Sequence, residues 1–596
     1  MSRKLFKGGD YLVTATDCKD VFIPEEFNDE QRQMSETAEQ FILNEVVPQL
    51  DEIESKNYAV TIDLLKQAGE LGLLLTDVPE EYGGLELDKT TSMLIAEKLG
   101  GRSGSFGLTA NCHTGIGTLP LVYYGTSEQK DRFLEQLAYG QLVGAYCLTE
   151  PGSGSDAMSA KTTAVLAEDG RHYVLNGTKQ FITNGGFADL FTVFAKIDGQ
   201  HFTAFLVERN FEGLEIGAEE KKMGLNGSST TQVILTNVKV PVENVLGEIG
   251  KGHKIAFNIL NVGRLKLGVV ASGMSKLGLS EAATYANERK QFGRNIGSFG
   301  AIKEKMADMT ATIFAAESMV YRISGMIDDR LEGITKGTDH YYDEYQKGIE
   351  EYAAECAMAK VYGSDSFAFV ADESLQVFGG YGYISEYEVE GLYRGERLQR
   401  IYEGTNEINR MIVPNTLFKR GFSGQLPLFE VAKQALADIA SNCVVKAGNE
   451  PFAIERALVQ NLKALVVATY ASAVEIYQAG LAEEQELLLA LADISIELFA
   501  MESAVLRGEK LLQSASATKA PAVEAVVRVA VFRASEKFRT AARRALCFMD
   551  GQGQSKELAK GLNLFSQYEV TGLLSAKRIL AEQTAEKERY IFDFAV

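Results

Sequence analysis

The sequence has few of the residues from which metal centres and disulfide frameworks are built. Its five histidines include no H-E-x-x-H pattern and no close pair, so we expect no metal site. Its six cysteines are scattered without a C-x-x-C pair, which favours a reducing compartment. No apolar run reaches about 18 residues, so no spanning helix is predicted. The N-terminus lacks the apolar core of a signal peptide. A bacterial cytoplasmic protein is therefore expected, in preference to one of the mitochondrial matrix.

Basic residues are also in deficit. The chain has 60 Lys and Arg against 81 Asp and Glu, a net charge of −21. Nucleic-acid binding depends on clustered basic residues, so nucleic acid is not expected as a partner. Residues 431–596 carry 19 basic and 20 acidic residues, so the deficit belongs almost wholly to the first 430. An anionic ligand of that part would need a locally basic site.

The 596 residues predict several domains, mainly helical, around one central β-domain. Apolar residues recur at helical spacing before residue 145, and again in 254–286, 298–328 and 345–378. Between them the pattern has period two, with Asn-Gly turns expected at 176–177 and 226–227. The predicted order is an arm (1–27), an α-helical domain (28–145), a β-barrel-like domain (146–252), an α-helical bundle (253–420) and an extra C-terminal helical domain (430–596).

One helix of the C-terminal domain has a basic, amphipathic character. Its apolar face is predicted to contain Val527, Val531, Ala534, Phe538, Ala542, Ala545 and Met549. Its basic flanks contain Arg528, Arg533, Lys537, Arg539, Arg543 and Arg544, opposed only by Glu536. Two interpretations remain open. The helix is a core helix with solvated flanks, or residues 521–549 make a peripheral membrane contact or bind an acidic partner.

Two segments carry residues suited to chemistry. YCLTEPGSGSDAMSA (146–160) is rich in small residues that allow close approach of backbone N–H groups to a ligand, although an ordinary interdomain loop explains it equally. In LQRIYEGTNEINRMIV (398–413), Glu403 precedes Gly404 and a helix for which Thr405 is the expected N-cap. Such a carboxylate can act as a base in a pocket, or it can simply be favoured by the helix dipole.

Taken together, seven segments resemble the acyl-CoA dehydrogenase family. They are YCLTEPGSGSD (146–156), FITNGG (181–186), KMGLNGSSTTQVILTNVKVP (222–241), ILNVGR (259–264), ERKQFG (288–293), LQVFGGYGY (375–383) and IYEGTNEINR (401–410). They occur in the family order and cover about residues 30 to 420. The added C-terminal region and ILNVGR make the chain most similar to the very-long-chain branch and its long bacterial relatives.

The resemblance implies FAD as cofactor. Residues at the family's FAD positions are Tyr146, Leu148, Thr149, Gly154, Ser155, Phe181, Ile182, Thr183, Arg289, Phe292, Gln376, Gly379, Gly380, Thr405 and Asn406. Some of these would come from a neighbouring subunit, which implies at least a homodimer. Phe181 stands where the family usually has tryptophan, in a chain that has none. Phenylalanine can still pack against a flavin but lacks the indole N–H.

The resemblance also implies a reaction. Glu403 corresponds to the base that removes the Cα proton of an acyl-CoA, while a hydride passes from Cβ to the flavin and trans-2-enoyl-CoA is formed. Some members carry the base at the position of Gly263, where this chain cannot supply one. Substrate contacts are expected from Ser155, Asn261, Arg264, Tyr402 and Gly404. Electrons would pass to electron-transferring flavoprotein.

The sequence constrains the length of the substrate's acyl chain and the choice between competing functions less strongly. The acyl tail is expected to end near FGLTANCHTG, where Gly107 is small and Asn111 is polar, and long-chain substrates are predicted. An acyl-CoA oxidase, which lets oxygen reach the reduced flavin, is the enzymatic alternative. A scaffold or assembly role through the C-terminal domain is the alternative of a different class.

Overall fold

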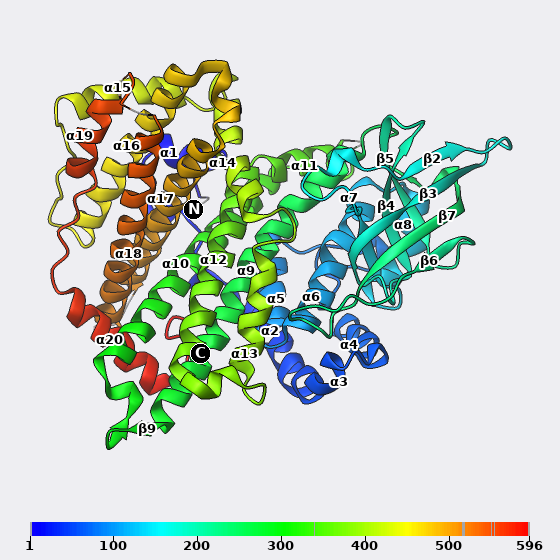
Figure 1. Ribbon diagram of the computed structural model, residues 1–596, viewed down its shortest axis with the longest axis horizontal. Coiled ribbons are helices and arrows are strands. Elements are labelled where there is room, and N and C mark those ends of the chain that lie inside the picture. The colour runs from blue at the N-terminus through cyan, green and yellow to red at the C-terminus, as the bar shows by residue number, and fades with distance from the viewer. Residues whose placement is uncertain (1–2, 339, 515–518, 550, 554, 594–596) are drawn as a thin grey trace.

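The structure is a computed structural model that describes residues 3–338, 340–514, 519–549, 551–553 and 555–593. Figure 1 shows a β-domain at one end, a group of C-terminal helices at the other, and long helices between them. The order of elements confirms the predicted fold class, which is mainly helical with a β-domain in the middle of the sequence and an added C-terminal helical domain.

The N-terminal region is a set of helices that packs beside the β-domain (Figure 1). Side chains that accept hydrogen bonds from the first-turn N–H groups start several of them, among them Asn28, Asp88 and Thr126. The helices are α2 (Asp29–Phe41), α3 (Leu50–Glu54), α4 (Tyr58–Glu70), α5 (Lys89–Gly100), α6 (Gly104–Cys112), α7 (Leu119–Tyr124) and α8 (Ser127–Ala138). The short helix α1 (Asp10–Val13) precedes them and packs on the C-terminal helices instead.

The β-domain is one eight-stranded sheet in the order β6-β7-β3-β2-β4-β5-β8, with β1 paired in parallel to β4. Strands β4 and β5 are buried along nearly their whole length, in keeping with their largely apolar sequences. The strands are β1 (Gly144–Cys147), β2 (Thr163–Leu166), β3 (His172–Thr183), β4 (Leu190–Ile197), β5 (His201–Glu208), β6 (Leu214–Ile216), β7 (Thr230–Pro241) and β8 (Val245–Leu246).

The prediction of a turn at Asn176-Gly177 is wrong. Both residues lie inside β3, at a shift of register against β7 between Leu175 and Gly177. A Cβ atom on Gly177 would lie 2.4 Å from Thr162 Oγ1 of the neighbouring chain segment, so the glycine permits close strand approach. The second Asn-Gly pair, at 226–227, does form a turn.

The central bundle is built on α9 (Gly252–Glu288), which packs along α12 (Ala353–Phe378) and against α10 (Gly300–Leu331). The helix expected over 345–378 is interrupted. It divides into α11 (Tyr341–Glu350) and α12, because Tyr352 leaves the helical conformation and its buried hydroxyl donates to the Phe6 carbonyl oxygen at 2.7 Å. The remaining elements of this part are the hairpin β9 (Lys290–Gln291) and β10 (Arg294–Asn295), α13 (Glu388–Gln399) and α14 (Asn406–Phe422).

The C-terminal helices form the end of the molecule opposite the β-domain (Figure 1). They are α15 (Leu428–Ala440), α16 (Ala453–Tyr477), α17 (Gln485–Ser514), α18 (Ala520–Phe548), α19 (Ser555–Phe565) and α20 (Leu573–Lys587). The predicted apolar face of α18 is buried, against α10, α17 and α20. Four of its basic side chains pair within the chain: Arg533 with Asp308 (2.9 Å), Lys537 with Glu497 (3.7 Å), Arg539 with Glu536 (3.6 Å) and Arg544 with Asp493 (3.5 Å). Peripheral membrane contact through 521–549 stays a prediction from the sequence alone.

The N-terminal arm lies on the C-terminal helices, although the two are more than 400 residues apart in sequence. Basic side chains of these helices donate to its carbonyl oxygens: Lys463 to Thr14 (2.8 Å), Arg456 to Thr16 (2.6 Å) and Lys510 to Val21 (2.8 Å). Cys18, Val21 and Ile23 of the arm form an apolar cluster with Leu506. The first and last parts of the sequence therefore fold as one layer.

Arg507 of α17 is the centre of a buried ionic cluster that joins this layer to the bundle. Its side chain has no exposed surface. The guanidinium donates to Glu317 Oε2 on α10 (2.6 Å) and to Glu25 Oε1 on the arm (2.7 Å). Glu317 also accepts from the Tyr590 hydroxyl at 3.0 Å and pairs with Lys276 of α9 at 2.5 Å. One cluster thus connects the arm, the bundle, α17 and the segment after α20.

Two helical segments within the described residues are long and apolar enough to cross a membrane by length and composition, Gly252–Glu288 and Ala453–Glu483. The most apolar windows of these segments are 83% and 78% buried inside the fold. Core helices of folded proteins pass the same test, and the burial of these two places them among the interior helices of the bundle and of the C-terminal domain.

Candidate active site

Glu403 lies in a short loop between α13 and α14. Thr405 is the N-cap of α14, as predicted, and its Oγ1 accepts a hydrogen bond from Ile408 N at 3.3 Å. Glu403 and Gly404 both have left-handed backbone conformations, with φ of 52° and 86°. This conformation is unfavourable for glutamate and persists only where its surroundings enforce it. The local backbone strain marks the loop as a functional feature.

Two side chains that the sequence interpretation overlooked hold this loop. Asn409 Nδ2 donates to the Gly404 carbonyl oxygen at 2.7 Å, and Lys360 Nζ of α12 donates to the same oxygen at 2.9 Å. Burial lowers the pKa of Lys360 to about 7, although Glu403 and Asp365 act in the opposite direction. A lysine within the apolar helical stretch AMAKVYG was the available signal for such a role.

The Glu403 carboxylate points at α9, where Gly263 makes room for it. A Cβ atom on Gly263 would lie 2.1 Å from Glu403 Oε2. That oxygen is buried and has no hydrogen-bond partner among the described residues. Buried carboxylate oxygens are normally satisfied, so an unsatisfied one in a cavity is expected to meet a ligand. Glycine at 263 is thus a steric requirement of the site as well as the absence of a second base.

Burial raises the pKa of Glu403 to about 7, and the nearby cations Arg264, Lys360 and Lys266 act against this increase. A carboxylate with such a pKa changes protonation near neutral pH, which is the range that suits a general base. Arg264 is itself buried on α9 and donates from Nη1 to Asn261 Oδ1 at 2.9 Å. The site therefore has a base and a fixed local positive charge in one place.

Glu403 lines a cavity of about 520 Å³ between the β-domain and α9. The cavity brings together thirteen of the predicted site residues: Tyr146, Leu148, Thr149, Gly154, Ser155, Phe181, Ile182, Thr183, Asn261, Arg264, Tyr402, Glu403 and Gly404. Its lining includes exposed side chains, among them Phe257 and Glu350. It also includes buried groups, among them Cys112, Gly115 and Lys266. We take the exposed part near Phe257 and Glu350 as the mouth of the cavity and the buried part as its inner end.

The β-domain side of the cavity suits a flat aromatic ligand. Phe181 is 62% exposed and has a φ of 58°, so a large apolar ring stands at the cavity wall without cover. The loop that follows β1 also borders the cavity. It is fixed by the buried ion pair between Glu150 in this loop and Lys179 of β3, whose charged atoms are 2.7 Å apart. A Cβ atom on Gly154 would contact nothing within 4 Å, which leaves open space beside the loop backbone. These features fit a flavin ring and its attached chain.

The other predicted cofactor residues lie outside this cavity. Arg289, Gly379 and Gly380 line a separate surface depression of about 590 Å³ beyond the end of α9. Gln376 is exposed, and Phe292 is 92% exposed. Asn406 is buried, and its Oδ1 accepts from Lys360 Nζ at 2.6 Å. One chain therefore holds Asn406 beside the Glu403 loop through Lys360, but leaves Arg289, Phe292, Gln376, Gly379 and Gly380 outside the Glu403 cavity.

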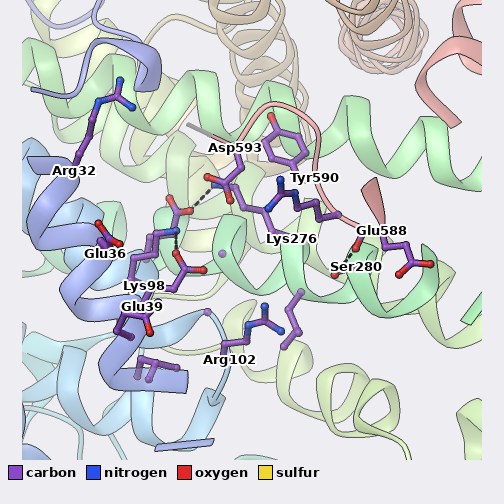
Figure 2. A pocket seen from close by; sticks show the side chains of 17 residues that line it. Arg32, Glu36, Glu39, Lys98, Arg102, Lys276, Ser280, Glu588, Tyr590 and Asp593 are labelled. Atoms are coloured by element: carbon purple, nitrogen blue, oxygen red, sulfur yellow. Dashed lines mark hydrogen bonds and ion pairs between the residues drawn. The ribbon is translucent and has the colours of Figure 1, made fainter. Parts of the chain in front are cut away.

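A second cavity, of about 580 Å³, lies between α2, α5, α9 and the segment after α20 (Figure 2). Its charges are mixed and balanced, with acidic side chains at Glu36, Glu39, Glu97, Glu588 and Asp593 and basic ones at Arg32, Lys98, Arg102, Lys276 and Arg589. Lys98 pairs with Glu39 at 3.1 Å and Lys276 with Glu97 at 2.7 Å. This second cavity has no excess charge of either sign with which to select an ion. We therefore assign the active site to the Glu403 cavity.

Replacing Gly263 with alanine is expected to displace the Glu403 carboxylate and to lower kcat/KM for acyl-CoA by about a hundredfold or more. The cause is the 2.1 Å contact described above. Steady-state kinetics on protein with unchanged flavin content measures the effect. Gly278→Ala on the same helix is the control, since its added methyl group would meet Ser374 Oγ at 3.1 Å, away from the cavity. Equal activity of the two variants would contradict the steric role.

Comparison with known proteins agrees with this geometry. Sequence profiles of the acyl-CoA dehydrogenase N-terminal, middle and C-terminal domains match residues 28–141, 145–238 and 250–418. A further acyl-CoA dehydrogenase C-terminal domain profile matches residues 461–561.

Individual relatives extend the match over nearly the whole chain. A probable acyl-CoA dehydrogenase of Bacillus subtilis is 44% identical over 98% of each chain. The human mitochondrial very long-chain specific enzyme is 36% identical over 76% of this chain and 70% of its own. The crystal structure of an acyl-CoA dehydrogenase complexed with FAD from Bacillus anthracis, 44% identical, has a TM-score of 0.96 and covers 98% of this chain and 100% of that one. The protein therefore belongs to the acyl-CoA dehydrogenase family and is an FAD-dependent oxidoreductase.

Proposed function

We propose that the enzyme oxidises long-chain acyl-CoA to trans-2-enoyl-CoA in fatty-acid β-oxidation, with Glu403 as the base that removes the Cα proton. The observation that carries the proposal is the Glu403 carboxylate, which faces the cavity with an unpartnered oxygen and a pKa near 7. FAD, when bound, accepts the hydride from Cβ. The Glu403 backbone N–H would bind the thioester carbonyl oxygen, on which negative charge develops as the proton leaves.

The residues of the cavity divide between the two ligands. Tyr146, Leu148, Thr149, Gly154 and the segment Phe181 to Thr183 would hold the flavin. Ser155, Asn261, Arg264, Tyr402 and Gly404 would contact the substrate, with Arg264 as the cation that favours an anionic ligand. Residues of the second group, Arg289, Phe292, Gln376, Gly379 and Gly380, would reach FAD from a second copy of the chain. Their position outside the cavity supports a homodimer in which each subunit completes the site of the other.

Electron-transferring flavoprotein is the proposed electron acceptor, and the bacterial cytoplasm the proposed location. An acyl-CoA oxidase is the alternative that shares the same base and cofactor. A scaffold role of the C-terminal helices is a separate alternative, and the intact Glu403 loop argues against scaffolding as the sole function. Of the α18 cations, Arg533 is mostly covered in its close pair with Asp308, which argues against its contact with a membrane surface.

The reductive half-reaction tests the proposal directly. Palmitoyl-CoA added without oxygen is expected to bleach the bound flavin, and octanoyl-CoA should do so more slowly. Flavin that stays oxidised with both would overturn the dehydrogenase assignment, and a clear preference for the C8 chain would overturn only the long-chain assignment. Stoichiometric hydrogen peroxide during turnover in air would favour the oxidase.

A further inference from the structure

A buried group of charges borders the closed end of the Glu403 cavity. Lys266 of α9 lies one turn beyond Gly263 and lines the cavity, and its side chain is 5% exposed. Its Nζ donates to Thr114 Oγ1 at 3.1 Å and lies 3.8 Å from Asp77 Oδ2. The ammonium group is therefore held against buried partners, and solvent is not within its reach.

The partners of Lys266 are themselves fixed. Asp77 pairs with Lys89 of α5 and accepts from Ser92 Oγ at 2.5 Å. Lys89 Nζ donates in turn to the Tyr123 hydroxyl at 2.8 Å. Although burial acts against it, Lys89 and Lys266 hold the pKa of Asp77 at about 2. Asp77 is consequently a permanent anion that holds the end of the Lys266 side chain in one place.

The methylene stem of Lys266 lies beside Gly115, which also lines the cavity. A Cβ atom on Gly115 would lie 3.6 Å from Lys266 Cδ and 4.0 Å from Nζ. The outer stem is thus next to the cavity lining, while Thr114 and Asp77 hold the charged group. Lysine commonly presents its apolar stem to an apolar surface in this way and directs its charge elsewhere.

The direction in which a substrate lies follows from the two ends of the cavity. CoA is large and polyanionic, so it must occupy the mouth near Phe257 and Glu350, and the acyl tail must point toward the buried end. We infer that Lys266 is a specificity-determining residue, whose stem, tethered by Asp77 and Thr114, closes the inner end of the cavity and limits acyl-chain length. This inference rests on the proposed acyl-CoA substrate.

The test is the binding of trans-2-enoyl-CoA products of 8 to 20 carbons to the FAD-loaded enzyme, measured by calorimetry. Each methylene that enters the cavity should tighten binding about fourfold, until the tail meets Lys266 and the dissociation constant levels off. In Lys266→Ala the levelling-off point should move about three to four carbons further, since the variant removes the outer part of a four-carbon stem. The variant leaves Asp77 paired with Lys89, so no buried charge is left alone.

Lys266→Met is the matched control, because methionine keeps most of the length of the stem without the charge. It should level off at the same carbon number as the unchanged enzyme. A levelling-off point that does not move in Lys266→Ala, or that moves equally in Lys266→Met, would overturn the inference. Flavin absorbance and thermal unfolding show whether each variant is folded. The readout is separate from the proposed function, because palmitoyl-CoA that binds without bleaching the flavin would overturn the reaction and leave the limit on chain length intact.

Discussion

Replacing Glu403 with glutamine is expected to slow reduction of the bound flavin by palmitoyl-CoA by about 10²–10⁴-fold, the usual contribution of a positioned general base. Glutamine has nearly the same size and can occupy the space opposite Gly263, but its amide cannot take up the Cα proton. Stopped-flow absorbance under anaerobic conditions measures the rate. Glu407→Gln, an exposed residue one turn away on α14, is the matched control and should react like the unchanged enzyme. A Glu403→Gln variant with full activity would exclude this residue as the base.

The raised pKa of Glu403 predicts how the rate of the reaction depends on pH. Only ionised Glu403 can accept a proton, and burial raises its pKa to about 7, so flavin reduction should fall as the pH drops below 7. A glutamate at its ordinary value of 4.5 would leave the rate unchanged down to about pH 5.5. The same pKa shift affects the stability of the fold in the opposite direction, since it favours the folded state at low pH. The folded state binds this proton more tightly than the unfolded chain, so the contribution is complete below pH 4.5 and is lost as the pH rises through 7.

Replacing Arg507 with methionine is expected to lower the free energy of unfolding by about 3–5 kcal/mol, because it leaves buried carboxylates without their main partner. Glu317 would keep only Lys276 and Tyr590, and Glu25 would lose its contact with α17. Urea denaturation followed by circular dichroism measures the loss. Limited proteolysis should also show faster cleavage in the arm before Glu25, since one of the contacts that hold the arm is removed.

The control for this variant is Arg539→Met, an arginine in the same domain whose pairing with Glu536 at 3.6 Å is solvent-exposed. Exposed ion pairs contribute about 0–1 kcal/mol, so its unfolding curve should barely move. Equal effects of the two substitutions would mean that the Arg507 cluster contributes no more to stability than a surface pair.

Local sequence patterns predicted the elements better than the way they are joined. The buried face of α18 and the N-cap at Thr405 followed from apolar spacing and from capping chemistry, because both depend on neighbouring residues alone. The turn at Asn176-Gly177 failed because the close approach of Thr162 from another strand overrides the local turn preference. Similarly, the break at Tyr352 depends on the distant carbonyl oxygen of Phe6.

The candidate site was predictable to a similar degree. The motifs identified Glu403 and the flavin-side residues that share its cavity. They did not identify Lys360 and Asn409, which hold the loop through the Gly404 carbonyl, or Asp77, which holds Lys266. These residues act through contacts between segments far apart in sequence, and a single sequence carries no record of such contacts beyond a charged residue in an apolar helix.

The joining of the arm to the C-terminal helices has a consequence for synthesis. Domains of a nascent chain generally fold in order as they leave the ribosome. Here Glu25 emerges first, but its partner Arg507 is made 482 residues later, and Tyr590 later still. Until then Glu317 has only Lys276 to balance it within the cluster. The dehydrogenase part is thus translated before its buried charges can be matched, and the ribosome must synthesise α17 before Glu25 has its partner.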